Sequence, residues 1–287
     1  VQSNSIGECF QTAFGIPSWI VGVALVIICG IIFLGGVQRL AAVTEKIVPI
    51  MAAIFLLGGL VILIFRIRYV PATFGMIFKY AFFPNAILGG GLGYALKTAI
   101  SQGAKRGLFS NEAGSGSAPC AAAAASCDDP VKMGFVQALG VLIDTVVICS
   151  CTAFMMLLAP ANITTGLTGM DLLQAAAQYH LGSFGVVFIA VTLALFSFST
   201  FIGILFYARS NVAYLFGDRW GWQTAYKVLA LVMLMVGGLE AYTVVWDLGD
   251  VGIGLMTIFN LIALYPMSGE AIAALRDYER RKHLTQN

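Results

Sequence analysis

The stretch Arg106–Ser126, RGLFSNEAGSGSAPCAAAAAS, decides the fold class because it places a polar, flexible segment inside an otherwise apolar chain. Asn111 and Glu112 are followed there by Gly114 and Gly116, with serines before, between and after them. A lipid-facing segment does not tolerate such a run, since its backbone and side-chain polar groups would lack hydrogen-bond partners. A broken helix that lines a binding cavity does tolerate it. We therefore interpret this stretch as a transmembrane helix that is interrupted at Ser110–Gly116.

The composition of the whole chain is that of a membrane protein. Of its 287 residues, 59% are hydrophobic and 10% are charged, and the mean hydropathy is +0.89. Ordinary soluble domains contain about 25% charged residues. Several uncharged stretches reach the roughly 20 residues that are needed to cross a bilayer. We therefore predict an all-α polytopic membrane protein, and the net charge of +2 gives no indication of nucleic-acid binding.

We predict seven transmembrane helices in a single transmembrane domain, residues 1–287. They are expected at Pro17–Val37, Ile47–Phe65, Gly93–Cys127 (the broken one), Val131–Ala159, Phe184–Ala208, Gly221–Leu239 and Gly249–Gly269. Gln38–Lys46 is predicted to be a short polar link. Asp128, Asp129 and Pro130 predict a turn and a helix start, because acidic residues are favourable at a helix N-terminus. Residues 66–93 and 160–183 contain proline and glycine and are predicted to lie at the membrane interface.

The distribution of basic residues predicts the orientation, because cytoplasmic segments carry an excess of lysine and arginine. One predicted side collects most of the basic residues: Arg39, Lys46, Lys132, Arg209, Arg219, Lys227 and the Arg276–Lys282 segment. The link before the last crossing carries three acidic residues, Glu240, Asp247 and Asp250. We therefore expect a multi-pass protein of the cell membrane with a cytoplasmic tail at 270–287. Three basic residues, Arg66, Arg68 and Lys79, fall on the predicted outer side and are exceptions to this rule.

Two carboxylates, Glu112 and Asp144, lie within predicted membrane segments. Ionisable groups are costly there and are functional candidates by default. For Asp144 the sequence leaves open whether it serves a cation or hydrogen-bonds the broken helix. For Glu112 it leaves open a coupling role or a protonated, structural one. In the break itself, glycines allow backbone groups to turn toward a ligand, and helix N-termini present N–H groups to a carboxylate. The alternative is a tight kink that Ser and Asn side chains cap locally.

The predicted fifth crossing contains a polar motif, FSFST, at residues 196–200. Residues three and four apart share one helix face, so the Phe196 carbonyl and the Ser199 and Thr200 hydroxyls are able to converge. Hard oxygen ligands of this kind suit a small alkali cation. The alternative is that these hydroxyls bond back to carbonyls one turn earlier.

The run KRGLFSNEAGSGSAP, Lys105–Pro119, resembles the signature of the alanine or glycine:cation symporter family, sodium-coupled amino-acid carriers of the LeuT-type fold. Further blocks resemble the family in the same order: VQSNSIGECF, GGVQRLAAVTEKIVPIM, AFFPNAILGG, LIDTVVICSCTA, LALFSFSTFIG and VWDLGD. The chain departs from the family pattern at four places. The family usually has a larger apolar residue at Ser115, a His at Ala122 and a Trp near Ile204, and it has Tyr-Gly-Glu where this chain has Tyr207–Arg209. These departures bear on substrate preference and on the end of the fifth crossing.

The resemblance implies a secondary active transporter, not an enzyme, that carries small neutral amino acids such as alanine or glycine into the cell with sodium. The alternatives are a LeuT-type carrier of another small solute or one coupled to another cation. An intramembrane enzyme is disfavoured because no His or Lys lies beside a candidate nucleophile in a crossing. The implied partners are the amino acid and the lipid bilayer, and a monomer is one option for the oligomeric state.

The resemblance also assigns site residues. The implied substrate contacts are Gln2, Phe109, Ser110, Asn111, Gly114 and Gly116. The implied ligands of the transported sodium ion are Phe196, Ser199 and Thr200, with Asp144 and Glu112 as candidates for coupling. LeuT-type folds pair two inverted repeats, each with a broken first helix. The break at Ser110–Gly116 corresponds to the second repeat, so the first broken helix is expected upstream of Val1 and the chain is expected to be a C-terminal fragment.

Overall fold

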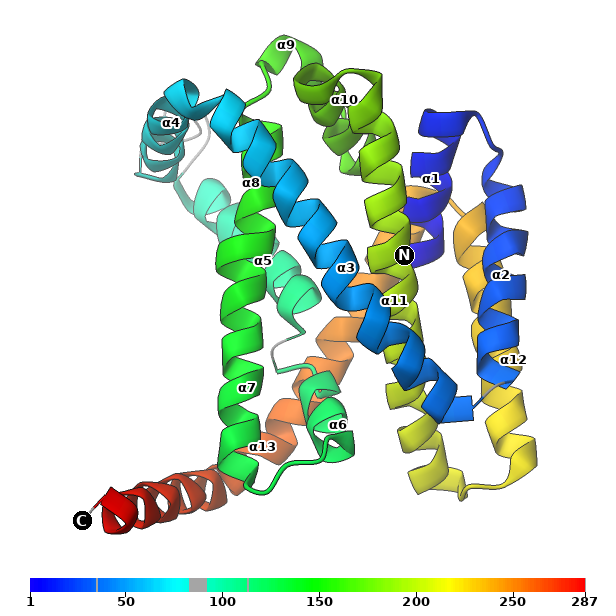
Figure 1. Ribbon diagram of the computed structural model, residues 1–287, viewed down its shortest axis with the longest axis vertical. Coiled ribbons are helices and arrows are strands. Elements are labelled where there is room, and N and C mark those ends of the chain that lie inside the picture. Colours follow the sequence, from blue (N-terminus) through cyan, green and yellow to red (C-terminus); the bar gives the residue numbers. More distant parts are fainter. Residues whose placement is uncertain (35, 83–91, 113, 287) are drawn as a thin grey trace. The chain divides into compact units, whose positions relative to one another are not determined.

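The computed structural model describes the backbone of residues 1–34, 36–82, 92–112 and 114–286, and their side chains except those of 34, 36–44, 80–82, 92–96, 99 and 283–286. All regular elements in these residues are helical (Figure 1). The first part of the chain forms α1 (Gln2–Phe14), α2 (Ser18–Leu34), α3 (Gly36–Phe65), the short 3₁₀ helix η1 (Ile67–Tyr69) and α4 (Val70–Phe82). The middle forms α5 (Leu92–Asn111), α6 (Ser117–Ala124), α7 (Pro130–Ile143), the π-helical segment η3 (Asp144–Cys149) and α8 (Ser150–Leu157). The last part forms α9 (Ala161–Thr164), α10 (Gly169–Leu181), α11 (Ser183–Phe216), α12 (Trp220–Leu239) and α13 (Tyr242–Gln286).

Five helical spans in the described residues are long and apolar enough to cross a membrane. They are Glu45–Phe65, Pro130–Leu157, Ser183–Phe216, Trp220–Leu239 and Tyr242–Lys282. Each corresponds to a predicted crossing, so a polytopic helical membrane protein is confirmed. The predicted first crossing is a shorter apolar helix, Ser18–Phe33. The remaining one, the broken crossing, is divided between α5 and α6.

The chain folds into two compact units. Unit 1 comprises 1–92 and 148–247, and unit 2 comprises 93–147 and 248–287. One boundary therefore falls inside the π-helical segment and another near the start of α13. The prediction of a single domain and the assignment to the LeuT-type fold stay predictions.

In unit 1, α11 is the central helix and packs against α1, α3, α10 and α12. Its first half contributes Phe188, Ile189 and Ala190 to a buried apolar cluster with side chains of α1, α3, α8 and α10. Its second half contributes Ile202 and Leu205 to a second cluster with α2 and α12. A helix that is apolar almost all round is expected to be buried in this way.

Close packing of α3 in unit 1 depends on two adjacent glycines. An added Cβ at Gly58 would overlap the ring of Phe188, and one at Gly59 would overlap the sulfur of Cys151. Small residues let membrane helices approach closely, which is where much of their association energy arises. The glycine pair therefore allows α3 to pack tightly against α8 and α11.

Unit 2 is held together along α13. Near its C-terminal end, Arg281 donates to the Asp129 carboxylate at 2.8 Å, and Phe135 and Tyr278 have ring centroids 6.2 Å apart. Asp129 also caps α7, because its other oxygen accepts the Val131 N–H at 2.9 Å. That backbone N–H first, and the guanidinium second, lower the pKa of Asp129. The predicted helix start at Asp129 and Pro130 is thus confirmed, with proline at the first helical position as expected.

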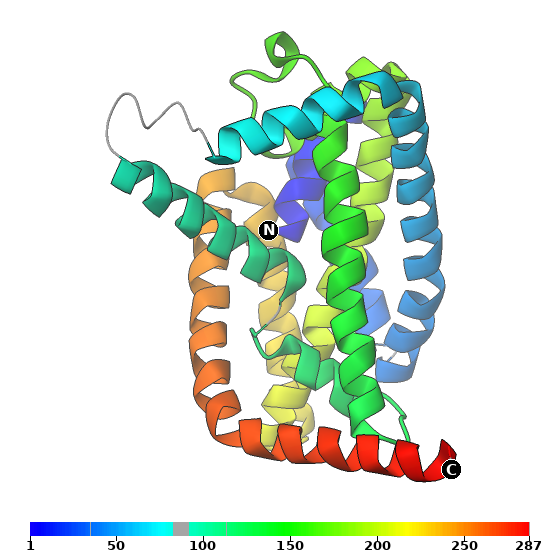
Figure 2. The same cartoon turned by 90° about the vertical axis from the view of Figure 1, so that its left-hand side faces the viewer.

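Some predicted boundaries are wrong. The link Gln38–Lys46 is helical, because α3 begins at Gly36. The fifth crossing continues eight residues beyond Ala208, as α11 ends at Phe216. The last crossing was also expected to run on into a basic helix ending at Lys282, and this is confirmed: α13 continues from Tyr242 to Gln286 and contains Pro266. The helix changes direction where its colour passes from orange to red (Figure 2). A proline inside a helix removes a hydrogen bond and bends it.

The two predicted interfacial regions contain short helices, α4 in the first and α9 and α10 in the second. Their position in a membrane stays a prediction. Pro84 and Gly89–Gly91, on which the first prediction partly depended, lie outside the described residues.

Candidate functional site

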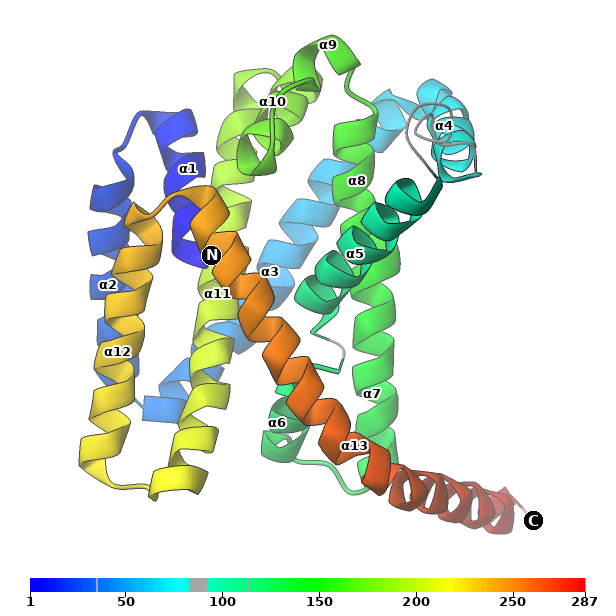
Figure 3. The same cartoon turned by 180° about the vertical axis from the view of Figure 1, so that it is seen from behind.

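The predicted break in unit 2 is present between α5 and α6 (Figure 3). Helix α5 ends at Asn111 and α6 begins at Ser117. Three residues between them have a left-handed backbone, with φ of 49° at Glu112, 86° at Gly114 and 94° at Gly116. Glycine adopts such angles readily, whereas a residue like glutamate rarely does. The right-handed helix is therefore interrupted here, and the left-handed conformation of Glu112 has a local energetic cost.

Serine side chains stabilise the break internally. The Glu112 carbonyl accepts two hydrogen bonds from Ser115, one from its backbone N–H at 3.1 Å and one from its hydroxyl at 2.7 Å. The Ser115 and Ser117 hydroxyls lie 3.1 Å apart, and both residues are buried. The predicted alternative of local capping by serine is thus part of the observed geometry.

Asp144 joins the end of α5 to the facing helix. Its Oδ2 accepts a hydrogen bond from the Ser110 hydroxyl at 3.1 Å and one from the Asn111 amide at 2.8 Å. The same amide nitrogen lies 2.8 Å from the Thr145 hydroxyl. Of the two options that the sequence left open for Asp144, hydrogen bonding to the broken helix is present in the structure. Its effect on ion coupling stays a prediction.

The position of Asp144 in its helix is unusual. It begins the π-helical segment η3, which separates α7 from α8. Short π-helical segments are rare and occur often at functional sites, because the wider turn redirects side chains and frees backbone groups. The amino-acid pattern around Asp144 did not indicate this π-helical segment.

A second missed contact comes from α13. The Asn260 side-chain amide donates to the Gly114 carbonyl at 2.9 Å, and an added Cβ at Gly114 would lie 3.9 Å from the Thr257 methyl group. Asn260 and Thr257 are three residues apart and therefore share one helix face. The sequence does mark both as candidates for a buried contact, since they are polar residues within the apolar run GLMTIFNLIALYP.

The N-terminal side of the break is fixed to α13 by an ion pair. Arg106 donates to both carboxylate oxygens of Asp250, at 2.6 and 2.7 Å, and the Asp250 side chain is 11% exposed. Both bonds come from the same nitrogen, Nη2, and charge-assisted hydrogen bonds of this kind are about twice as strong as neutral ones. The Arg106 guanidinium also lies 5.8 Å from the ring centroid of Phe109. Phe109 is half-buried, and its predicted contact with substrate stays a prediction.

A cavity of about 320 Å³ adjoins the break within unit 2. Its lining comprises Ser110, Asn111, Ala118, Gln137, Ala138, Gly140, Val141 and Asp144. Three of the residues that the sequence analysis singled out therefore line one space, with α6 and α7 supplying the rest. Glu112 is half-buried and is not among the residues that line this cavity.

The FSFST motif lies on α11 in unit 1. The Ser199 and Thr200 hydroxyls each donate to the Phe196 carbonyl at 2.9 Å, so the three predicted oxygens do converge. The same geometry also matches the alternative, in which the hydroxyls bond back to a carbonyl one turn earlier. Ser199 is additionally 3.5 Å from the Met51 sulfur on α3. The convergence is thus present, and ion binding stays a prediction.

Gln2 is the first residue of α1 in unit 1 and is half-buried. Its neighbours Ser3, Asn4 and Ser5 are buried, and the Asn4 amide donates to the Glu240 carbonyl at 3.0 Å. The structure shows no group of three or more His, Cys, Asp or Glu side chains among its described residues that could hold a metal ion.

Comparison with known proteins agrees with these observations. The sequence profile of the sodium:alanine symporter family matches residues 1–287. The chain is 40% identical over 282 residues to the probable sodium/glutamine symporter GlnT of Bacillus subtilis, covering 98% of this chain and 58% of GlnT. It is 37% identical over 299 residues to the sodium/proton-dependent alanine carrier protein of Bacillus sp. PS3, covering 98% and 66%.

An archaeal relative is similar over the entire chain. The sodium/alanine symporter AgcS of Methanococcus maripaludis is 36% identical over 290 residues, covering 100% of this chain and 63% of AgcS. The chain thus spans less than two thirds of the length of these three relatives. From the profile match and from these identities, we conclude that the chain belongs to the sodium:alanine symporter family.

Proposed function

We propose that this chain is part of a sodium-coupled symporter of small neutral amino acids with a LeuT-type inverted-repeat fold. The observation that carries the proposal is the break after α5, which Asp144 holds from one helix and Asn260 from another. The family to which the chain belongs consists of symporters, which argues against the enzyme alternative. In this proposal, an upstream repeat supplies the other broken helix of the site.

The break supplies the two kinds of backbone group that an amino acid requires. The N-terminus of α6 presents the backbone N–H groups of Ser117 and Ala118 toward the break, and N–H groups at a helix N-terminus favour a carboxylate. The C-terminus of α5 directs backbone carbonyls toward the break, and such carbonyls favour an ammonium group or a sodium ion. Gly114 and Gly116 keep side chains away from both groups. In this proposal Ser110 and Asn111 position the end of α5, Phe109 closes over the substrate side chain, and Gln2 adds a polar contact.

The proposed sodium site uses the Phe196 carbonyl and the Ser199 and Thr200 hydroxyls. A hydroxyl that donates to a carbonyl keeps its lone pairs available as acceptors. If both hydroxyl protons turn away, three oxygens face the ion, and oxygen ligands of this kind suit a hard cation. We assign Asp144, and secondarily Glu112, to the coupling between ion and substrate. The alternative stays a carrier of another small solute or cation, because the relatives' names mention glutamine, alanine and protons.

Uptake into proteoliposomes tests the proposal directly. The complete carrier, meaning this chain together with its upstream repeat, is reconstituted with an inward sodium gradient, and uptake of labelled alanine is compared with that of labelled glutamine. We expect saturable alanine uptake that disappears when potassium replaces sodium. Uptake that follows a proton gradient without sodium, or that favours glutamine, would support the alternative. Sodium-independent exchange without net uptake would contradict symport.

We also propose that the C-terminal tail is cytoplasmic, on the basis of the Arg276–Lys282 segment and the acidic residues that precede α13. A cysteine-free variant with a single cysteine introduced at Ser268 or at Thr285 tests this orientation in intact cells. A membrane-impermeant maleimide should label neither position until the cells are opened. Labelling of position 285 in intact cells would reverse the orientation.

A further inference from the structure

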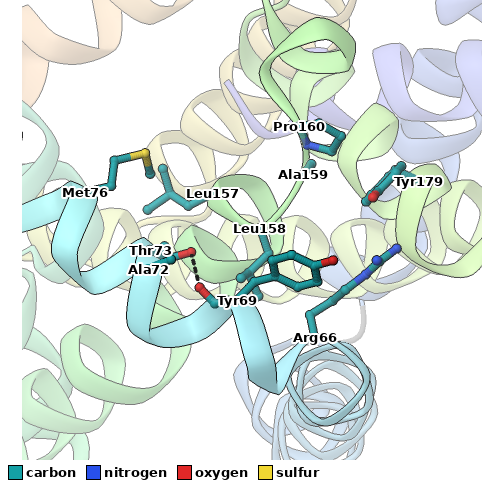
Figure 4. Close-up of a pocket in the computed structure, with 10 residues that line it drawn as sticks. All are labelled: Arg66, Tyr69, Ala72, Thr73, Met76, Leu157, Leu158, Ala159, Pro160 and Tyr179. Carbon is teal, nitrogen blue, oxygen red and sulfur yellow. Dashed lines mark hydrogen bonds between the residues drawn. The ribbon is translucent and has the colours of Figure 1, made fainter.

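A second cavity lies in unit 1, away from the residues that the proposed transport site uses. Its volume is about 300 Å³, at the lower limit of typical ligand pockets. It is lined by Arg66, Tyr69, Ala72, Thr73, Met76, Leu157, Leu158, Ala159, Pro160 and Tyr179 (Figure 4). They come from the turn after α3, from η1 and α4, from the end of α8 and the turn after it, and from α10. Most belong to the segments 66–93 and 160–183 that the sequence predicts at the membrane interface, and Leu157, Leu158 and Ala159 end the predicted fourth crossing.

Arg66 is the charged group of this cavity. Its guanidinium lies 4.6 Å from the ring centroid of Tyr179, so the aromatic face holds it in place. Arg66 is half-buried, yet among the described residues no carboxylate lies within 4.0 Å of it. An arginine has five N–H donors and is always charged. The cavity therefore presents a fixed cation whose donors are available to an anion.

The segment of unit 1 that contains Arg66 is positively charged. Residues 46–92 contain no Asp or Glu, and their basic residues are Lys46, Arg66, Arg68 and Lys79. Arg66, Arg68 and Lys79 are also the residues that break the positive-inside rule in the predicted orientation. An amino-acid zwitterion is a poor fit for the cavity, because no lining side chain is acidic and its ammonium group would face Arg66. A group with net negative charge fits better.

The segments that supply Arg66, Tyr69 and Thr73 to the cavity also expose large apolar side chains. Phe65 at the end of α3, Ile67 on η1, and Phe74 and Phe78 on α4 are 75%, 61%, 46% and 60% exposed. A soluble anion gains nothing from such apolar surface, whereas acyl chains pack against it. Basic pockets beside membrane helices, flanked by apolar surface, bind the headgroups of anionic lipids.

We propose that this cavity binds the phosphate of an anionic phospholipid at the membrane interface. Arg66 pairs with the phosphate oxygens, Tyr179 keeps the guanidinium oriented, and the Tyr69 and Tyr179 hydroxyls add hydrogen-bond donors. The acyl chains lie along the exposed aromatic residues of α4. The site goes beyond the proposed transport function and does not depend on it. It also gives the basic residues on the predicted outer side a reason to be there.

Native mass spectrometry of the purified 287-residue chain tests the proposal. The chain is titrated in detergent with phosphatidylglycerol and, separately, with phosphatidylcholine. We expect one tightly retained phosphatidylglycerol, and roughly ten-fold weaker retention in the Arg66→Gln variant, because a charge-assisted contact is lost. Arg68→Gln is the matched control, since Arg68 is exposed and does not line the cavity. It should change retention less than two-fold.

Further variants and ligands distinguish a specific lipid site from diffuse attraction and from a free-phosphate site. Arg66→Lys keeps the charge but loses the planar fork, so its retention should lie between those of wild type and Arg66→Gln. If Arg66→Gln does not fold, Tyr179→Leu, which removes the stacking ring, should weaken retention instead. Equal effects of Arg66→Gln and Arg68→Gln would show diffuse surface attraction and overturn the site. Equal retention of the two lipids, or displacement by millimolar inorganic phosphate, would overturn the assignment to an anionic phospholipid.

Discussion

Replacing Asp144 by asparagine keeps the shape of the side chain and removes its charge, so it isolates what the carboxylate contributes at the break. In the native protein, Asp144 Oδ2 accepts from Ser110 at 3.1 Å and from Asn111 at 2.8 Å. An asparagine carbonyl oxygen placed at the same position still accepts both hydrogen bonds. The change therefore converts two charge-assisted hydrogen bonds into two neutral ones.

The size of the effect follows from the difference between these two kinds of bond. Hydrogen bonds to charged groups contribute about 1.5–3 kcal/mol, and neutral ones about 0.5–1.5 kcal/mol, so each bond loses about 1 kcal/mol. Ser110 is exposed and Asn111 is half-buried, which favours a lower total of about 1.5 kcal/mol. If the break must hold its geometry for the substrate to bind, this energy corresponds to an approximately ten-fold weaker apparent affinity for alanine.

The assay is sodium-driven alanine uptake by the complete carrier in proteoliposomes, measured over a range of alanine and sodium concentrations. Two variants serve as controls. Thr145→Val removes a neutral hydrogen bond to the same Asn111 amide, so it should weaken alanine affinity by a smaller factor. Asp218→Asn makes the same chemical change at an exposed ion pair, where Arg209 lies 3.6 Å away, and it should have no measurable effect.

Two results would refute this reasoning. Unchanged alanine affinity in Asp144→Asn would show that the charge is not needed to position the break. A normal alanine affinity combined with a lost sodium dependence would show that Asp144 acts on the cation directly, which is the other option that the sequence left open.

Three further predictions follow from the structure. Gly114→Leu should abolish alanine binding, because φ is 86° there and a bulky side chain would fill the break. The control Gly107→Leu on α5, where an added Cβ meets nothing within 4 Å, should bind alanine normally. Equal binding by both variants would indicate a purely structural kink. Thr200→Val should raise the sodium concentration for half-maximal uptake several-fold and leave alanine affinity at saturating sodium nearly unchanged, because it removes an oxygen and keeps the β-branched shape; a loss of alanine affinity alone would assign this face to the substrate. Burial lowers the pKa of His180, its hydrogen bond to the Met155 carbonyl opposes this, and Arg66 lowers the pKa further. The folded protein should therefore lose stability as the pH falls below about 6.5, the usual histidine pKa, and a thermal-unfolding series should show a weaker acid dependence in His180→Gln. A wild-type protein that is more stable at pH 5.5 than at pH 7.5 would contradict this.

The local features of the fold were predictable from the sequence because they depend on neighbouring residues. The break was predictable from Gly114, Gly116 and the serines beside them, since these residues disfavour a continuous helix in an apolar setting. The start of α7 was predictable from Asp129 and Pro130 for a similar reason. Hydropathy located the long spans because a membrane helix needs a continuous apolar run.

The contacts that complete the candidate site were not predictable in the same way. Asp144 lies 33 residues from Asn111, and Asn260 lies 146 residues from Gly114. A single sequence marks such residues as polar in an apolar helix and does not say which partner they face. The extension of α3 through Gln38–Lys46 was missed because polarity was taken as the end of a helix, although lysine, glutamate and glutamine are good helix formers.

The division of the chain into interleaved units has a consequence for the order of synthesis. Residues 93–147 of unit 2 leave the ribosome well before residues 248–287, and all of 148–247 must be made in between. Because the Gly114 carbonyl is bound by Asn260, 146 residues later, translation at about 5–20 residues per second leaves the break without this partner for roughly 7–30 seconds. The break after α5, which contains Glu112 with its positive φ, is thus completed late in synthesis. Substitution of Asn260 should therefore reduce the yield of correctly inserted protein as well as its activity.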